Sequence, residues 1–427
     1  MSTMDDGPPL ADPETSRRRR SEGDGRETGS VPARPGSRAE GGRQGKRKNR
    51  RRRRRGPVYA PGSGPRVAAA PEKGGHAPIL AVAGEAQARE AHYAALDLGT
   101  NNCRLLIAAP RENGFRVVDA FSRIVRLGEG VGATGKLQES AMRRAIEALR
   151  ICGAKLTERN VLRARMIATE ACRTAANGAD FIRRVRDETG LELEVVSRET
   201  EARLAVAGCA SLIDPEASGV LVFDIGGGSS ELVWLDLAGD SAGRRMADRI
   251  RNWMSLPLGV VNVSERHGGR DVTPERFEAM VAEVAELLLG FPEIEALDAA
   301  ASAGGMHMLG TSGTVTTLAG IHLGLPRYDR RRVDGVWLSG DEVRDLVAEL
   351  ASMDYEARVA NPCIGRERAD LVIAGCAILE AFRRRWPLDR LRVADRGLRE
   401  GVLMELMSED GVWPAGSGRR AGEPHHA

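Results

Sequence analysis

The stretch 220-VLVFDIGGGSSELVWL-235 places an aspartate, three glycines and two serines between two runs of apolar residues. Short apolar runs bounded by turn residues are typical of buried strands. The pattern therefore predicts a strand that ends near Asp224, a tight turn and a second strand. Because the glycines have no Cβ, their backbone N–H groups can approach an anion closely, and the carboxylate can hold a divalent cation beside it.

A second copy of this pattern lies earlier in the chain. The stretch 94-AALDLGTNNCRLLIA-108 also consists of an apolar run, an aspartate, one apolar residue, a glycine, small polar residues and a further apolar run. One copy alone is explained equally well by a hairpin with a capping aspartate. Two matched copies, with a third loop rich in Gly, Ser and Thr at 309-LGTSGT-314, favour two related domains that hold phosphate groups between them.

Strands and helical segments alternate along the chain after residue 90. The helical apolar spacing of 139-ESAMRRAIEALRICGAKL-156, for example, is followed by the short apolar run 165-RMIAT-169. Such alternation predicts an α/β protein with central sheets. We expect one domain at about 91–168, completed by a C-terminal helix at about 398–408, and a second domain at about 169–397.

Both ends of the chain are expected to be disordered, over residues 1–90 and 409–427. The first segment is rich in Gly, Pro, Ser, Arg and Ala without apolar periodicity, so it cannot bury enough surface to offset its ordering entropy. Its 20 Lys and Arg against 11 Asp and Glu give it a charge of about +9, whereas the whole chain carries +3. The run 46-KRKNRRRRRR-55 is either a solvated tail or a tether for a polyanion such as RNA, DNA, an acidic membrane surface or polyphosphate.

The composition excludes several classes of protein. The six cysteines are far apart and form no C-x-x-C pair, which favours reduced thiols in a cytoplasmic protein over a disulfide framework or a zinc site. No run of about 18 apolar residues is present, so no membrane span is expected. The segment 130-GVGATGKL-137 fits most of a P-loop pattern but has Leu137 where a Ser or Thr should reach Mg²⁺.

The repeated loops resemble the phosphate hairpins of the actin, sugar-kinase and heat-shock-ATPase superfamily, and the chain resembles the exopolyphosphatase and guanosine pentaphosphate phosphatase family. The resemblance implies two actin-like (ribonuclease-H-like) α/β domains that face each other across a cleft, with Mg²⁺ as cofactor. It also implies release of the terminal phosphate of inorganic polyphosphate or of the 5′-γ phosphate of pppGpp, and it suggests a homodimer. The motifs that carry it, between residues 93 and 406, are ALDLGTNNCRLLIA, RLGEGV, ATEACRTAAN, ETEARL, VFDIGGGSSEL, GTSGT, RAD and DRGLREGVL.

Hydrolysis of a phosphoanhydride requires a positioned water, an acceptor for its proton and positive charge near the transferred oxygens. The resemblance makes Glu170 the water-activating residue and Glu201 a second active-site acid, although each could be an ordinary glutamate in the first turn of a helix. Asp97 and Asp224 are the expected Mg²⁺ ligands. The expected phosphate-binding residues are Gly99, Thr100, Asn101, Arg126, Arg173, Gly226, Gly227, Gly228, Ser229, Ser312, Gly313 and Thr314.

Two functions from other classes remain compatible with the sequence. A kinase or ATPase of the wider superfamily would transfer phosphate to or from a nucleotide in the same cleft. A sensor, free or tethered to RNA through its basic tail, would bind polyphosphate or an alarmone without turnover. The two glutamates favour water as the nucleophile, and the motifs do not separate polyphosphate from pppGpp.

Overall fold

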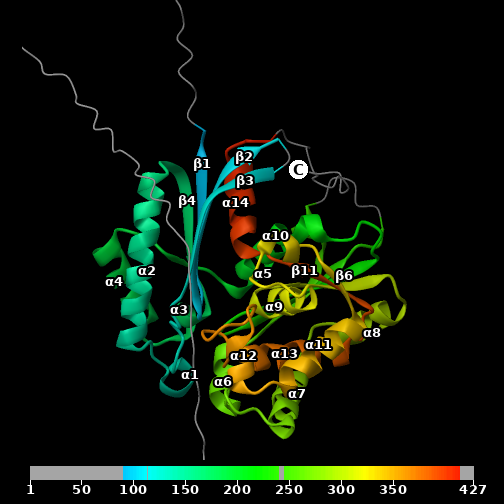
Figure 1. Ribbon diagram of the computed structural model, residues 1–427. Coiled ribbons are helices and arrows are strands. Elements are labelled where there is room, and N and C mark those ends of the chain that lie inside the picture. The colour runs from blue at the N-terminus through cyan, green and yellow to red at the C-terminus, as the bar shows by residue number, and fades with distance from the viewer. Residues whose placement is uncertain (1–89, 113, 240–244, 414–427) are drawn as a thin grey trace, which may run out of the picture. The chain divides into compact units, whose positions relative to one another are not determined.

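The computed structural model describes residues 90–112, 114–239 and 245–413 (Figure 1). All of them belong to one unit of the chain, residues 83–427. The predicted tail up to residue 89, including Lys46–Arg55, lies outside the described residues. In the described part of the chain, no helix combines the length and the apolar character that a membrane crossing requires. The six cysteines are buried and free.

The first sheet has the strand order β3-β2-β1-β4-β5. Its first three strands form an antiparallel meander, and β4 and β5 continue the sheet parallel to β1. The bounds are β1 His92–Leu98, β2 Asn102–Arg111, β3 Gly114–Ile124, β4 Val161–Ala168 and β5 Glu194–Val195.

The second sheet repeats this arrangement in the order β10-β11-β9-β6-β7-β8. Strands β6, β7 and β8 form the meander, β9 and β11 continue parallel to β6, and β10 adds an antiparallel edge. The shared order confirms the prediction of two related α/β domains of the ribonuclease-H-like type. The bounds are β6 Gly219–Ile225, β7 Ser230–Asp236, β8 Ile250–Leu256, β9 Met306–Thr311, β10 Trp337–Ser339 and β11 Arg390–Ala394.

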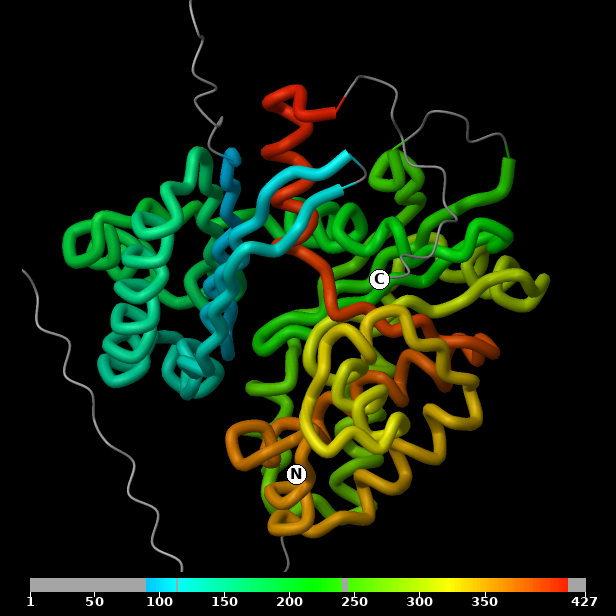
Figure 2. The backbone as a smooth tube through the Cα atoms, turned by 45° about the horizontal axis from the view of Figure 1, so that its top comes forward, coloured from blue at the N-terminus to red at the C-terminus, as the bar shows by residue number. Residues whose placement is uncertain are grey.

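Helices cover both faces of the first sheet. On one face, α2 (Glu139–Glu158) and α4 (Gly178–Thr189) bury Ile146, Leu149 and Phe181 against the strands. On the other, α5 (Arg198–Cys209) and the C-terminal α14 (Leu398–Glu409) share a core with β1 and β2. Figure 2 shows the chain leaving β11 and returning to the first sheet as α14.

The two helices α5 and α14 cross closely because glycines line their contact. A Cβ at Gly208 would overlap the carbonyl of Gly397, and a Cβ at Gly401 would overlap the carbonyl of Leu204. The other face of α5 packs on the second sheet through Ala202 and neighbouring apolar residues. The α5–α14 pair is therefore the packed connection between the two lobes.

The second sheet carries most of the remaining helices on its far face, around a large apolar core. Helix α7 begins after Thr273, whose side chain caps the helix, and Pro274 follows at its first position. Helix α11 begins with a capping box, in which Glu342 Oε2 accepts from the Ser339 N–H at 2.7 Å. The helices are α6 Val260–His267, α7 Pro274–Leu288, α8 Ile294–Ser302, α9 Gly313–His322, α11 Gly340–Ser352, α12 Tyr355–Ala360 and α13 Val372–Arg385, with single turns at α1 Val131–Thr134, α3 Glu170–Thr174 and α10 Arg330–Val333.

Strand pairing carries the first sheet past residue 168, where the boundary between the domains was predicted. Strand β5 pairs with β4, and Leu191 and Leu193 belong to the core of the first sheet. The chain enters the second lobe only through α5. Part of the segment 409–427, predicted to be disordered, is packed instead: the Trp413 Nε1–H donates to the Arg111 carbonyl at 2.7 Å.

Candidate functional site

The two glycine-rich hairpins meet face to face. The β1–β2 turn holds Thr100 and Asn101, and the β6–β7 turn holds Gly227 and Gly228. A Cβ built on Gly227 would lie 2.9 Å from the Thr100 Cβ, and one built on Gly228 would lie 2.7 Å from the Thr100 Oγ1. Since only glycine permits this approach, the sequence of the second hairpin determines how closely the two lobes meet.

A cavity of about 480 Å³ lies where the hairpins meet. Its size is ordinary for a small-molecule site. Most of the residues predicted for the site line it. They are Asp97, Gly99, Thr100, Asn101, Glu170, Glu201, Asp224, Gly226, Gly227, Gly228, Ser229, Ser312 and Gly313.

Ser312 joins the third predicted loop to the site. It precedes α9 with a positive φ of 79°, a backbone conformation that non-glycine residues adopt mainly where the surroundings impose it. The adjacent Thr311 Oγ1–H donates to the Arg396 carbonyl at 2.6 Å, which ties this loop to the segment that leads into α14. The loop therefore forms the wall of the cavity on the side of the second sheet.

Three predicted phosphate ligands lie outside the cavity lining. Arg126 instead forms a bidentate pair with Asp370 of the second lobe, with Nη1–Oδ2 at 2.8 Å and Nη2–Oδ1 at 2.9 Å. Thr314 is buried on α9, where its side chain fills the space above Gly375 of α13. Arg173 bonds protein groups throughout: the Val196 carbonyl and the carboxylates of Glu170 and Glu201.

Glu170 stands at the start of α3, directly after β4, and is buried. Its Oε2 accepts from Arg173 Nη2 at 2.6 Å, and its Oε1 accepts from Arg198 Nη2 at 2.6 Å. Two guanidinium groups therefore neutralise this carboxylate. These contacts fix the position of the Glu170 carboxylate at the cavity wall, so the geometry suits a residue that positions Arg173 and Arg198.

A different pair of carboxylates has the properties of a general base. Burial raises the pKa of Glu201 well above its ordinary value, and the nearby Glu231 raises it further. Burial also raises the pKa of Glu231, to about 7, with Asp224 as the next cause. Glu231 Oε1 accepts from the Ser255 hydroxyl at 2.9 Å. A carboxylate that titrates near neutral pH is well matched to accept a proton from water.

Glu231 was missed in the sequence, although it lies within the quoted hairpin. It follows Ser229 by two residues, so in a strand with period two both side chains lie on the same face. The same strand, 231-ELVWL-235, is otherwise apolar and buried. An acid that directly precedes a buried apolar run and follows a glycine loop was the available signal.

The two aspartates lie near the ends of β1 and β6, next to the two hairpin turns, and both line the cavity. Burial raises the pKa of Asp97. Burial raises the pKa of Asp224 to about 6, where Arg104 opposes the rise and Asp97 adds to it. The two carboxylates repel each other and offer only oxygen atoms as ligands. Such a pair fits a hard cation such as Mg²⁺ better than a transition metal.

The described residues contain no cluster of three or more Asp, Glu, His or Cys side chains that could enclose a metal ion. Mg²⁺ usually keeps several waters and takes one or two carboxylates together with substrate phosphates. The two aspartates therefore fit a cation that is completed by a phosphate ligand. They do not form a closed structural metal site.

The cavity also holds arginines that were quoted only as parts of motifs. Arg104, Arg368 and Arg399 line it, and among the described residues none of them forms an ion pair or a hydrogen bond with a carboxylate. Arg104 lies opposite Asp97 in the β1–β2 register. Burial lowers the pKa of Arg399, and Glu400 opposes this shift. These guanidinium groups bring positive charge into the cavity, and their geometry is of the kind that suits anionic oxygens.

The Ppx/GppA phosphatase family matches residues 106–410. This chain belongs to that family. Exopolyphosphatase 2 of Mycobacterium tuberculosis is 30% identical over 330 residues, which cover 73% of this chain and 98% of the relative. The match confirms the resemblance drawn from the motifs.

Solved structures of the Ppx/GppA family share the fold. The Aquifex aeolicus family member is 30% identical with a TM-score of 0.59, covering 75% of this chain and 99% of its own. A protein described as exopolyphosphatase-like is 28% identical with a TM-score of 0.65, covering 74% of this chain and 99% of its own. The Ppx/GppA region thus spans nearly the whole length of these relatives.

Proposed function

We propose that this protein is a Mg²⁺-dependent hydrolase that releases the terminal phosphate of inorganic polyphosphate. The observation that carries the proposal is that two glycine-rich hairpins, each with its own aspartate, meet in one cavity beside Glu201 and Glu231. The names of the M. tuberculosis relative and of the exopolyphosphatase-like structure support polyphosphate as the substrate.

The hairpins bind the substrate in this proposal. Their backbone N–H groups surround the phosphate oxygens of the chain end, and Arg104, Arg368 and Arg399 neutralise the remaining charge. Asp97 and Asp224 would hold the Mg²⁺ ion, which supplies additional positive charge at the phosphate oxygens. Binding of the phosphates also relieves the repulsion between neighbouring arginines in the cavity.

Burial raises the pKa of both carboxyl groups, that of Glu231 to about 7, and Glu231 raises the pKa of Glu201 further. In its ionised form, Glu231 accepts the proton of a water that attacks the terminal phosphorus. The P–O–P bond breaks, and the bridging oxygen leaves on the shortened chain. Arg173 positions Glu201 at 3.1 Å, and Glu170 holds Arg173 in place.

The test compares phosphate release from polyphosphate by the wild type, Glu231→Gln, Glu201→Gln and Glu170→Gln. We expect Glu231→Gln to lower kcat by about 10²- to 10⁴-fold with little change in KM, as for a lost general base. Glu170→Gln should reduce kcat less. If Glu170→Gln is the more damaging change, Glu170 is the water-activating residue, as its sequence motif suggested.

The 5′-γ phosphate of pppGpp has the same terminal anhydride, and the family includes phosphatases of this type. The cavity of about 480 Å³ is also large enough for a nucleotide-sized ligand. Kinetics on pppGpp, measured beside those on polyphosphate, decide between the two substrates. An absence of turnover on both would favour a sensor, and phosphate transfer to a nucleotide would favour a kinase.

We also propose that the basic segment Lys46–Arg55 binds a polyanion, because its charge is concentrated in ten residues. Deletion of residues 1–89 should leave phosphate release from tripolyphosphate unchanged and should weaken the binding of RNA and of long polyphosphate. The loss should be smaller at high salt. Unchanged binding of both polyanions would contradict the tether.

A further inference from the structure

Four exposed arginines stand next to cavity-lining residues in the sequence. Arg123 on β3 follows Ser122, which lines the cavity, and Arg327, Arg331 and Arg332 flank the lining residues Tyr328 and Arg330 around α10. We call these four residues (Arg123, Arg327, Arg331 and Arg332) the rim arginines. Each is exposed and stands within two residues of a cavity residue, so its Cα lies at most about 7 Å from one that lines the site.

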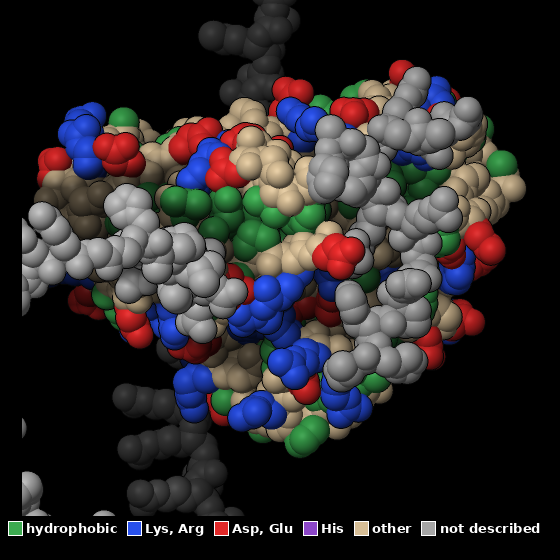
Figure 3. Space-filling view, turned by 90° about the horizontal axis from the view of Figure 1, so that it is seen from above, with side chains coloured by type: hydrophobic (Ala, Val, Ile, Leu, Met, Phe, Trp, Pro, Cys, Tyr) green, Lys and Arg blue, Asp and Glu red, His purple; other side chains and the backbone are tan. Residues whose placement is uncertain are grey.

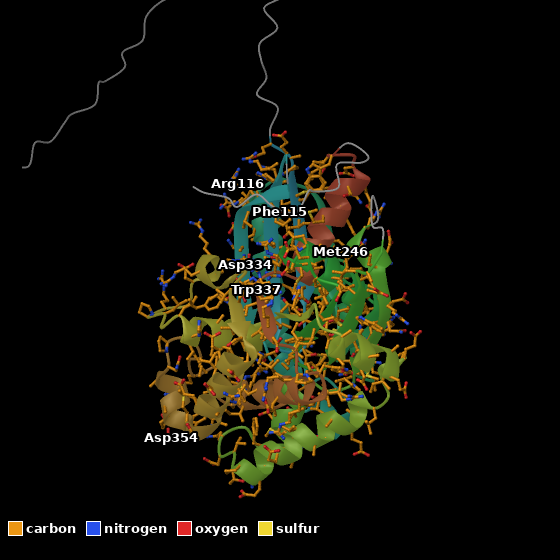
Figure 4. The ribbon with its side chains drawn as sticks, turned by 90° about the vertical axis from the view of Figure 1, so that its right-hand side faces the viewer. Phe115, Arg116, Met246, Asp334, Trp337 and Asp354 are labelled. Carbon is orange, nitrogen blue, oxygen red and sulfur yellow. The ribbon has the colours of Figure 1, made fainter. Side chains whose placement is uncertain are left out.

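Among the described residues, no Asp or Glu side chain forms an ion pair with a rim arginine. In contrast, two lining arginines have acidic partners. Arg330 pairs with Asp395 at 3.0 Å, and Arg396 pairs with Asp334. Figure 4 labels Asp334 near Trp337. The segment 327-RYDRRR-332 contains one opposing charge, Asp329, whose Oδ1 accepts from the Arg331 backbone N–H at 3.0 Å. The segment therefore keeps a net positive charge next to cavity-lining residues.

Figure 3 shows Lys and Arg side chains gathered near the centre of one face of the molecule. Charges act on a polyanion over about one Debye length, roughly 8 Å at physiological ionic strength. The separation of the rim arginines from the cavity lining falls within this range. A chain of phosphates that leaves the cavity over α10 or β3 would therefore pass within their field.

We propose that the rim arginines bind the part of an inorganic polyphosphate chain that extends out of the cavity. This inference rests on the proposed function and adds a specificity to it. A cavity of about 480 Å³ holds only the end of a long chain, so the rest of that chain lies outside. Tripolyphosphate ends within the cavity and does not pass over the rim side chains, so it gains less from their charge than a long chain does. The rim therefore gives the site a preference for long chains over short ones.

The experiment measures steady-state phosphate release by the full chain on long-chain polyphosphate and on tripolyphosphate. The test variant is Arg327→Gln/Arg331→Gln/Arg332→Gln. The matched control is Arg186→Gln/Arg270→Gln/Arg276→Gln, which removes three exposed charges at positions more than two residues from any residue that lines the cavity. For the rim variant we expect the KM for long chains to rise about threefold to tenfold, as for two or three exposed charge contacts.

The kcat on both substrates should stay as in the wild type, the KM for tripolyphosphate should rise much less than that for long chains, and the control should change neither KM. The difference between the wild type and the rim variant should shrink as salt is added. An equal rise of KM on both substrates, or no rise on long chains, would overturn the rim proposal while leaving the hydrolase intact.

A binding measurement separates this proposal from the proposed function. Equilibrium binding of long-chain polyphosphate and of tripolyphosphate needs no turnover, so it tests the rim even if the wild type releases no phosphate. A rim variant that loses much more affinity for the long chain than for tripolyphosphate supports the proposal. Equal affinity of the wild type and the rim variant for the long chain refutes it.

Discussion

Replacement of Gly227 by alanine should disable the enzyme without unfolding it. The added Cβ would lie 2.9 Å from the Thr100 Cβ and 3.1 Å from the Asn101 backbone nitrogen. Carbon atoms prefer separations of about 3.5–4.0 Å, so the two hairpins must move apart by roughly 0.5–1 Å. A displacement of this size at a reacting centre can cost on the order of 10²-fold in rate. Overpacking of this kind costs about 1–3 kcal/mol of stability.

The assay measures kcat/KM for phosphate release together with the free energy of unfolding in urea. Gly153→Ala is the matched control. Gly153 lies on helix α2, and a Cβ added there would lie 3.7 Å from the Leu191 side chain, an ordinary van der Waals distance. Alanine there should stabilise the helix by about 1 kcal/mol and leave activity unchanged. A Gly227→Ala enzyme with wild-type kcat/KM would refute the claim that the close approach of the hairpins builds the site.

Two further predictions concern charged groups. Asp370→Asn and Arg126→Gln should each weaken substrate binding, because this pair joins the two lobes through two partly buried hydrogen bonds. A double-mutant cycle should give a coupling energy of about 1 kcal/mol between the two residues. Additive effects of the two substitutions would contradict this role. Glu231→Gln should raise the free energy of unfolding of the metal-free protein by up to about 3 kcal/mol above pH 7. Burial raises the pKa of Glu231 from 4.5 to about 7, so the folded state keeps a proton that the unfolded state has lost. Wild-type stability therefore falls as pH rises through this window, and an equal slope in the variant would contradict the shift.

The hairpins and the α/β class could be predicted because local signals agree there. The glycine loops sit between apolar runs in both copies, and the two sheets repeat one strand order. The return of α14 to the first sheet was also predictable, since its apolar residues need a partner. Strand β8 and helix α6 were not predicted, because 250-IRNWMSL-256 and 260-VVNVSERH-267 lack clear periodicity and depend on the second sheet for their burial.

Most residues that line the site were predicted from the motifs, whereas the contacts of its acids were not. Glu170 follows a strand and resembled a catalytic glutamate, yet the distant Arg198 supplies half of its neutralisation. That contact joins residues 28 positions apart and leaves no local pattern. Arg126 similarly pairs with Asp370, 244 residues away. Glu231, in contrast, was visible within its strand, but its raised pKa depends on burial and on Asp224.

The most direct test of the facing hairpins is the Mg²⁺ dependence of phosphate release from polyphosphate by the wild type, Asp97→Asn and Asp224→Asn. The two aspartates stand on different sheets but beside one cavity. If they hold the same cation, each variant should raise the Mg²⁺ concentration for half-maximal activity and lower the maximal rate, and the wild type should be inactive without the ion. Wild-type Mg²⁺ dependence in either variant would contradict the account.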